Sequence, residues 1–424
     1  MQLVEQHVIK HSDSRFAPID AAAFAAKNLY NAALYEVRQT YIFEHRYLGN
    51  SEVYHRMKPT PAYRALPRKV GNSILRQLDT NWRAFFAALE AWKEAPGKFL
   101  GRPKLPKYKH KTRGRFLLIY DLQALSRRAL ARGRLRPSGL DIEVQTGHKT
   151  VKQARIVPRA GYYVVEIVYE QAEAAPSGNP ALVASVDIGV DNLAALTSNK
   201  PGFVPRLVNG RPIKSTNHYY NKRRAALQEA LSHLGITARM ARLTTRRTRR
   251  INHYLHTASK AIIALLAQEG IGTLIVGKNA GWKQEAELGR VNNQHFVGLP
   301  HARFIQMLAY KAKLAGMRFV LQEESYTSRA SALDSDAMPL YDPKRAGKPV
   351  FSGKRIKRGL YQARDGRTVN ADVNGSANIL RKALPNAFEA DGIEAVAVRP
   401  VWLTFAWSVQ PRALAAAPAI PTSQ

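Results

Sequence analysis

An aspartate at the end of an apolar segment is the first residue in this chain whose position suggests chemistry. Residues 181–196 have the sequence ALVASVDIGVDNLAAL, and the apolar run predicts a buried strand from 182 to 188. Burying a carboxylate without a partner is unfavourable, so Asp187 has no packing role there. We interpret Asp187 as a metal ligand; the alternative is a strand-end residue satisfied by hydrogen bonds. Asp191, a few residues further on, is interpreted as structural.

A second aspartate, far along the chain, lies at the start of a predicted helix, where it could also hold a metal ion. Asp372 opens a predicted short helix in the segment NADVNGSANILRKAL, residues 370–384. It could serve only as the N-cap of that helix. Two such carboxylates and a third can instead hold a pair of Mg²⁺ ions about 4 Å apart, which is the arrangement of nucleases of the RNase H type.

The charge of the chain indicates a polyanionic partner. The 424 residues include 65 Lys and Arg against 31 Asp and Glu, a net charge of +34, which favours nucleic acid. There is no cysteine, so disulfides and thiolate zinc sites are excluded. No apolar run approaches the roughly 18 residues of a membrane span, and the first residues lack the core of a signal peptide. We therefore expect a cytoplasmic, nucleoid-associated protein with no membrane partner.

Hydrophobic periodicity divides the chain into segments. Helical spacing predicts two long helices, 19–45 and 70–95, and period-two alternation over 117–170 predicts an antiparallel barrel or sandwich. The later order of strand 271–277, helix 300–316 and strand 317–325 predicts a parallel crossover. Residues 326–371 are predicted to form an irregular insertion, ordered by packing of its larger apolar side chains. These are Leu333, Leu340, Tyr341, Ile356, Leu360 and Tyr361.

Two basic segments are predicted to contact a phosphate backbone. A connector at 97–116 has no acidic residue, and a second segment concentrates arginines within twelve residues. The alternatives are a solvated linker and a solvated helix face. The candidate residues are Lys104, Lys107, Lys109, Lys111, Arg239, Arg242, Arg246, Arg247, Arg249 and Arg250.

Four motifs in order resemble the TnpB family, the transposon-encoded RNA-guided DNA endonucleases related to type V CRISPR effectors. VDIGVDNLAAL (186–196) looks like the first RuvC motif and NADVNGSANILRKALP (370–385) like the third. GRPKLPKYK (101–109) looks like the basic connector, and ESYTSRAS (324–331) like the start of the zinc ribbon. Each motif alone is weak, whereas all four in this order are specific.

The resemblance implies an α+β multidomain fold with an RNase H-like RuvC nuclease domain, an oligonucleotide-binding-like β-barrel and an inserted helical lobe. Its expected parts are a wedge barrel of residues 1–14 and 104–175, a helical recognition lobe of 15–103, a RuvC domain of 181–325 and 370–400, a degenerate zinc-ribbon-like insertion at 326–369, and a disordered tail at 411–424. The implied partners are a guide RNA from the transposon end and a double-stranded target DNA with a short adjacent motif.

The sequence departs from the family pattern at the zinc ribbon. Residues other than cysteine stand at the four ligand positions, so no zinc is expected. In the register that the motifs imply, these are Ser331, Asp334, Gln362 and Asp365.

A second departure concerns the middle carboxylate. The glutamate that family members usually carry at the end of the middle strand is replaced by Gly277. A branch of the family supplies this acid from the next strand, where Glu323 and Glu324 are adjacent. Because successive strand residues face opposite sides, we expect one of the pair at the site and favour Glu324.

The resemblance therefore implies an RNA-guided DNA endonuclease of a transposable element. Asp187, Asp372 and either Glu323 or Glu324 would be catalytic, holding Mg²⁺, with Mn²⁺ as a substitute. A nuclease-inactive RNA-guided DNA-binding repressor is the first alternative, favoured by the loss of the acid at position 277. A structural RNA-binding protein is the second, which explains the charge but not the two aspartates.

Overall fold

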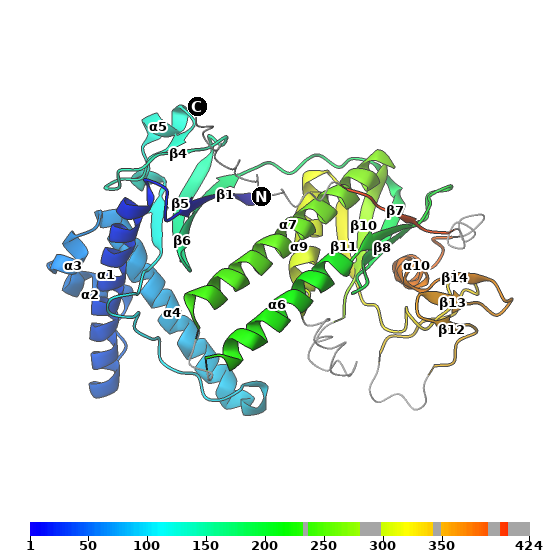
Figure 1. Cartoon of the computed structure of the whole chain (residues 1–424), viewed down its shortest axis with the longest axis horizontal. Coiled ribbons are helices and arrows are strands. Elements are labelled where there is room, and N and C mark those ends of the chain that lie inside the picture. The colour runs from blue at the N-terminus through cyan, green and yellow to red at the C-terminus, as the bar shows by residue number, and fades with distance from the viewer. Residues whose placement is uncertain (232–235, 280–297, 342–348, 389–398, 406–424) are drawn as a thin grey trace, which may run out of the picture. The chain divides into compact units, whose positions relative to one another are not determined.

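The chain forms a mixed α and β structure, as predicted, with two compact units, Met1–Ala172 and Glu173–Gln424 (Figure 1). The computed structural model describes residues 1–231, 236–279, 298–341, 349–388 and 399–405. The predicted tail at 411–424 lies outside them. Within the described residues, no helix is both long and apolar enough to cross a membrane.

The first unit is built on a four-stranded antiparallel sheet in the order β1-β6-β5-β2. Alternate residues of β6, such as Val165 and Ile167, are fully buried in the core of this unit, which is the period-two pattern of the sequence. A separate two-stranded ladder joins β3 to β4. Closure of these strands into a barrel stays a prediction. The strands are β1 (Gln2–Lys10), β2 (Leu118–Asp121), β3 (Arg134–Leu135), β4 (Val144–Gln145), β5 (Val151–Arg159) and β6 (Tyr162–Glu170).

Two long helices, α1 and α4, pack against each other in this unit, close to the predicted positions. Trp82 on α4 is fully buried, so its aromatic ring is a core residue. Shorter helices that the sequence pattern did not predict fill the connection between the long ones. The helices are α1 (Phe16–Phe43), α2 (Asn50–Met57), α3 (Pro61–Arg64), α4 (Arg68–Glu94) and α5 (Arg127–Ala131), with single 3-10 turns at Pro96–Lys98 and Leu122–Ala124.

The second unit is built on a six-stranded mixed sheet in the order β11-β10-β7-β8-β9-β15. The strand β10 pairs in parallel with both β7 and β11, which confirms the predicted crossover, whereas β7, β8 and β9 are antiparallel. The strands are β7 (Asn179–Asp187), β8 (Asn192–Ser198), β9 (Arg206–Asn209), β10 (Ile271–Gly277), β11 (Arg318–Gln322) and β15 (Val401–Trp402).

Helices cover both faces of this sheet (Figure 1). Ala184 and Val186 of β7 pack with the α7 and α9 side, whereas Val183 packs with α10 on the opposite face. Gly270, at φ 71°, adopts the left-handed conformation that lets α7 end and β10 begin at once. The helices are α6 (Arg211–Glu229), α7 (Ala238–Gln268), α9 (His301–Leu314) and α10 (Ala371–Ala383).

The insertion before α10 is more regular than predicted. It contains a three-stranded antiparallel sheet of β12 (Lys354–Lys357), β13 (Leu360–Gln362) and β14 (Thr368–Asn370). Of the side chains predicted to order it, Leu333 and Tyr361 are buried, but Leu340, Tyr341 and Ile356 are exposed. That part of the prediction is wrong because small neighbours, such as Ala332 and Ala363, fill the core around Tyr361 instead.

Candidate active site

Asp187 is the last residue of β7 and shares the face of β7 that α10 covers. The alternation that points Val183 toward α10 also points Ser185 and Asp187 there. One step beneath the carboxylate, Ser185 Oγ lies 2.8 Å from Thr197 Oγ1 and 2.7 Å from the backbone oxygen of Ser376 on α10. These buried hydrogen bonds fix the distance between β7 and α10, and therefore the position of Asp187.

The helix α10 approaches the Asp187 carboxylate at a glycine. A Cβ atom built on Gly375 would lie 2.5 Å from Asp187 Oδ2, which is closer than non-bonded atoms can approach. Any side chain at position 375 would displace the carboxylate. The glycine of the NADVNGSAN motif therefore provides the space in which Asp187 meets the helix.

Asp372 lies in the first turn of α10 but does not cap the helix. The N-cap is Asn370, whose Oδ1 accepts hydrogen bonds from the backbone N–H groups of Asp372, at 3.0 Å, and Val373, at 3.2 Å. The Asp372 carboxylate instead accepts from Asn192 Nδ2 at 2.6 Å and from Arg355 Nη2 at 3.5 Å. Its side chain is thus available to a ligand rather than committed to the helix end.

Glu323 and Glu324 follow the end of β11 and have different partners. Glu323 accepts hydrogen bonds from Lys382 Nζ and from the backbone N–H of Ser325. Glu324 lies against Gly277, because a Cβ atom built there would be 2.4 Å from Glu324 Oε2. The missing side chain at 277 therefore leaves the space that the Glu324 carboxylate occupies.

The acidic side chains perturb one another. Burial, with the nearby charge of Asp372, raises the pKa of Asp187 to about 7, and Arg355 opposes this shift. Burial, with the charges of Asp187 and Glu323, raises the pKa of Glu324 to about 8. Asp187 is thus the carboxylate that interacts with both of the others. Within the described ranges, no three Asp, Glu or His side chains lie close enough to hold a single ion.

Comparison with known proteins supports the family assignment. A family model described as "Probable transposase" (OrfB_IS605) matches residues 166–283, and one described as "Cas12f1-like, TNB domain" matches residues 301–379. A "TnpB-like protein ORF457" of Acidianus two-tailed virus is 24% identical over 84% of this chain and 81% of its own length. These matches confirm the predicted resemblance to the TnpB family and to the related type V effectors.

Two further proteins are similar to this chain. The "CRISPR-associated endodeoxyribonuclease Cas12f2" of a Micrarchaeota archaeon is 26% identical over 53% of this chain and 41% of its own length. The match to a protein chain in the solved structure of a Cas12f1–sgRNA–target DNA complex covers 85% of this chain and 81% of the matched chain, with 12% identity and a TM-score of 0.48. At that TM-score the structural likeness adds nothing to the assignment.

Arg355 and Asn192 are site residues that the sequence analysis missed. Arg355 comes from β12 of the insertion, and Asn192 begins β8, yet both contact the Asp372 carboxylate. Asp191, predicted to be structural, pairs with Lys214 at 2.8 Å and with Arg358 of the same insertion. The only sequence signal for this docking was the high density of basic residues in the insertion.

The basic connector presents its side chains to solvent because its backbone is anchored to α1. The backbone of Lys109 exchanges hydrogen bonds of 2.8 and 2.9 Å with the Asn31 side chain, and the backbone oxygen of Lys111 accepts one from Lys27 Nζ at 2.6 Å. The four predicted lysines, Lys104, Lys107, Lys109 and Lys111, are all exposed.

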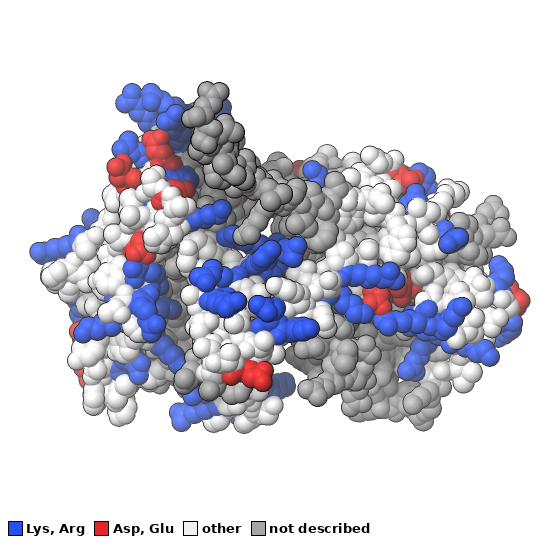
Figure 2. All heavy atoms as spheres, in the orientation of Figure 1, with Lys and Arg blue, Asp and Glu red and all other residues white. Residues whose placement is uncertain are grey.

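The arginines of α7 separate into two groups, and Figure 2 shows basic side chains gathered over α6 and α7. Arg247 is half-buried: it donates to Asn217 Oδ1 at 2.6 Å and to the backbone oxygen of Gly298 at 3.0 Å, and it lies over the Tyr220 ring. It therefore supports the packing of α6 and α7. Arg250 is partly buried. The exposed members, here named the α7 arginine row, are Arg239, Arg242, Arg246 and Arg249.

Proposed function

We propose that this chain is an RNA-guided, Mg²⁺-dependent endonuclease of a transposable element that cuts DNA. The observation that carries the proposal is the convergence of acidic side chains from three distant segments at one end of the second unit's sheet. Asp187 ends β7, Glu324 follows β11, and Asp372 opens α10. Two glycines, Gly277 and Gly375, leave the room that the carboxylates need.

The donor set suits a hard divalent cation. Carboxylate oxygens are the ligands that Mg²⁺ and Mn²⁺ prefer. Burial, and then the neighbouring carboxylates, raise the pKa values of Asp187 and Glu324, and a bound cation would favour their ionised forms. Asp187 would hold one ion with Asp372 and a second ion with Glu324, since it interacts with both. When bound, two such ions supply activation of a water molecule and neutralisation of the leaving 3′ oxygen of a phosphodiester.

The other residues of the site position these carboxylates. Asn192 orients Asp372 through its 2.6 Å hydrogen bond. Lys382 pairs with Glu323, which leaves Glu324, against Gly277, as the carboxylate that interacts with Asp187. Arg355 is half-exposed and only weakly bonded to Asp372 at 3.5 Å, so it can turn toward the phosphate of a bound strand.

The partners follow from the charge and from the family. The exposed connector lysines and the α7 arginine row give basic surfaces for a guide RNA from the transposon end and for target DNA carrying a short adjacent motif. The endodeoxyribonuclease named among the relatives supports DNA as the strand that is cut. In this proposal the first unit supplies the wedge and recognition lobe, and the second the RuvC domain.

The test is cleavage by the Asp187→Ala variant of the full chain with its copurified RNA. We expect loss of Mg²⁺-dependent cutting of DNA matched to that RNA, with DNA affinity unchanged, because one ligand is lost while the phosphate contacts remain. Asp191→Asn is the matched control: it removes a nearby carboxylate that pairs with Lys214 and Arg358, and it should keep cutting. Equal cutting by Asp187→Ala and the parent would refute the proposal.

One observation favours a nuclease-inactive RNA-guided repressor as the second candidate. Among the described residues, the acidic side chains do not gather around a single ion position. A parent protein that binds guide-matched DNA but does not cut it, with either Mg²⁺ or Mn²⁺ present, would establish this function.

A further inference from the structure

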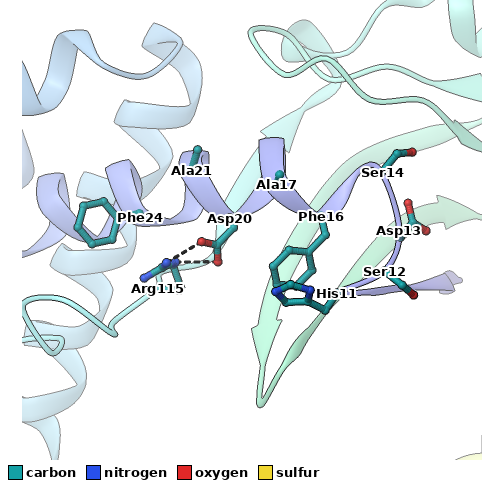
Figure 3. Close-up of a pocket in the computed structure, with 10 residues that line it drawn as sticks. All are labelled: His11, Ser12, Asp13, Ser14, Phe16, Ala17, Asp20, Ala21, Phe24 and Arg115. Carbon is teal, nitrogen blue, oxygen red and sulfur yellow. Dashed lines mark hydrogen bonds and ion pairs between the residues drawn. The ribbon is translucent and has the colours of Figure 1, made fainter.

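A hollow in the first unit lies along the first turns of α1. Phe16, Asp20 and Phe24 are spaced four residues apart and so share one face of the helix, while Ala17 and Ala21 also line the hollow (Figure 3). The cavity has a volume of about 790 Å³, within the usual range of ligand sites. The small alanines and the two aromatic side chains give it an open, largely apolar surface.

Hydrogen bonds hold the polar side chains of this hollow in place. Arg115 donates to both oxygens of Asp20, at 2.8 and 2.6 Å, and the Tyr163 hydroxyl donates to the same carboxylate at 2.7 Å. The Arg115 guanidinium lies 4.9 Å from the centre of the Phe24 ring (Figure 3). Asp20 accepts three hydrogen bonds of about four that a carboxylate can accept, which leaves one position for an added N–H donor.

Aromatic rings lie next to this polar group. The Phe16 ring is 4.7 Å from the His11 ring and 5.3 Å from the Tyr163 ring, centre to centre. This packing holds Phe16 in place while one side of it faces the hollow (Figure 3). An immobilised aromatic face beside a cation and a hydrogen-bond acceptor suits a flat, polar-edged ring.

A second hollow adjoins the first and is basic. It has a volume of about 600 Å³ and shares Phe16, Asp20 and Arg115 with the first. Its other lining residues include Arg113, in the loop before β2, and Arg159, at the turn between β5 and β6. Both of these arginines are exposed, so an anion can reach them.

We propose that the two hollows together bind one unpaired nucleotide. The base would stack against Phe16, with an exocyclic amino group donating to Asp20, and the phosphate would lie at Arg113 and Arg159. The proposal rests on the proposed function only in requiring that the chain bind nucleic acid. The same chemistry has two possible sources: the guide RNA and the displaced strand of the target DNA.

The experiment measures the affinity of the full chain, freed of copurified nucleic acid, for fluorescent oligonucleotides at several salt concentrations. The probes are a short single-stranded RNA, a single-stranded DNA of the same sequence, and the RNA in duplex form. In Phe16→Leu we expect binding of the single strands to weaken about 10-fold with an unchanged salt slope, because stacking is lost and the phosphate contacts remain. Phe43→Leu, on the exposed end of the same helix, is the matched control.

Two other variants test the hollow itself. Ala21→Leu fills it without changing charge, and leucine is a good helix former, so this variant should fold and still bind single strands more weakly. Arg113→Ala with Arg159→Ala should flatten the slope of log affinity against log salt by about 1.4 units, at about 0.7 per lost phosphate contact on a single strand.

The source of the nucleotide follows from which single strand is affected. Loss on RNA alone assigns the site to the guide, and loss on DNA alone assigns it to the displaced strand. If the parent binds and Phe16→Leu matches it, or loses affinity equally for duplex RNA, the pocket assignment is wrong and the proposed function stands. If the parent binds none of the probes, the proposed function itself fails.

Discussion

Replacing Gly277 by alanine should disturb the site through the Glu324 carboxylate. The new Cβ atom would lie 2.4 Å from Glu324 Oε2, 2.5 Å from Ile379 Cδ1 and 3.2 Å from Ile379 Cγ1. Ile379 is fully buried between α10 and the sheet and has little room to move, whereas the Glu324 carboxylate can swing aside. Overpacking of this kind costs about 1–3 kcal/mol. We therefore expect Gly277→Ala to destabilise β10 and α10 by that amount and to reduce cleavage strongly.

A double-mutant cycle separates the two contacts. In a Glu324→Ala background the carboxylate is gone, and only the contact with Ile379 remains. The cost of Gly277→Ala should then fall by about 1 kcal/mol, within the 0.5–3 kcal/mol typical of touching residues. Hydrogen exchange of the β10 and α10 amides measures the local free energy of opening for each member of the cycle. Gly147→Ala is the control, because nothing lies within 4 Å of a Cβ atom built there.

The space beside Gly277 should also allow the carboxylate to be returned to position 277. Gly277→Glu combined with Glu324→Ala places the acid where family members usually carry it, and we expect this double variant to recover part of the cleavage that Glu324→Ala loses. Gly277→Glu alone should remain poorly active, because two carboxylates would compete for one space. Two results together would refute the hypothesis that position 277 and the Glu324 carboxylate share one space. Gly277→Ala would cost the same with and without Glu324, and the double variant would be inactive.

Three other predictions concern the basic surface, one ion pair and the metal content of the insertion. Changing the four members of the α7 arginine row to alanine should reduce the slope of log DNA affinity against log salt by about 3 to 4 units. Arg247→Ala should leave this slope unchanged and loosen α6 from α7. An unchanged slope in the four-arginine variant would mean that the row is only a solvated face. The Arg115 guanidinium lowers the pKa of Asp20 in the folded protein. The ion pair therefore stabilises the fold fully above the pKa of Asp20 in the unfolded chain, near 3.8, and this stabilisation is lost as the pH falls through the lower pKa of the folded protein. Asp20→Asn should therefore lower the free energy of unfolding at pH 7 by about 1–3 kcal/mol and much less in strong acid, as denaturant titrations at each pH will test. The insertion should contain no stoichiometric zinc by elemental analysis, and EDTA should not change its unfolding, while Asp334→Ala should destabilise it.

Sequence periodicity was sufficient for the elements whose faces are buried. The predicted strand at 271–277 has the same bounds as β10, and the helix predicted at 300–316 differs from α9 by one residue at the start and two at the end. Both are apolar segments whose residues face a large core, so their pattern is strong. The parallel pairing of β10 with β11 followed from the crossover rule. Because β7 also pairs in parallel with β10, the carboxyl ends of β7 and β11 lie at the same end of the sheet.

The choice between Glu323 and Glu324 could not follow from alternation along a strand. The strand β11 ends at Gln322, so both glutamates lie beyond the regular pleat. Their orientation depends on Lys382, which binds Glu323, and on the space at Gly277, both distant in sequence. Arg355 was missed for a similar reason: its sequence neighbours are basic and exposed, and only the docking of the β12 strand brings it to Asp372.

Hydrogen bonds join parts of the insertion at positions where the resemblance predicts cysteines. Asp334 Oδ2 accepts from Ser352 Oγ at 2.8 Å and from the backbone N–H of Arg364 at 2.9 Å, so one carboxylate joins three parts of the insertion. At another of these positions, Ser331 Oγ accepts a hydrogen bond from the backbone N–H of Asp334 at 3.2 Å. A partly buried carboxylate with several donors can act as a local crosslink, although each bond is weak.

Two asparagines of α10 connect this insertion to the acidic site. Asn374 exchanges hydrogen bonds of 2.8 and 2.9 Å with the backbone of Ala330 and Ala332, and Asn378 Nδ2 donates to the backbone oxygen of Thr327 at 2.9 Å. Thr327 in turn donates its backbone N–H and its hydroxyl to the backbone oxygen of Glu324. The helix that presents Asp372 therefore also fixes the turn that presents Glu324. Because the connection is made of fully buried amide side chains, we expect the relative position of the two acids to depend on α10.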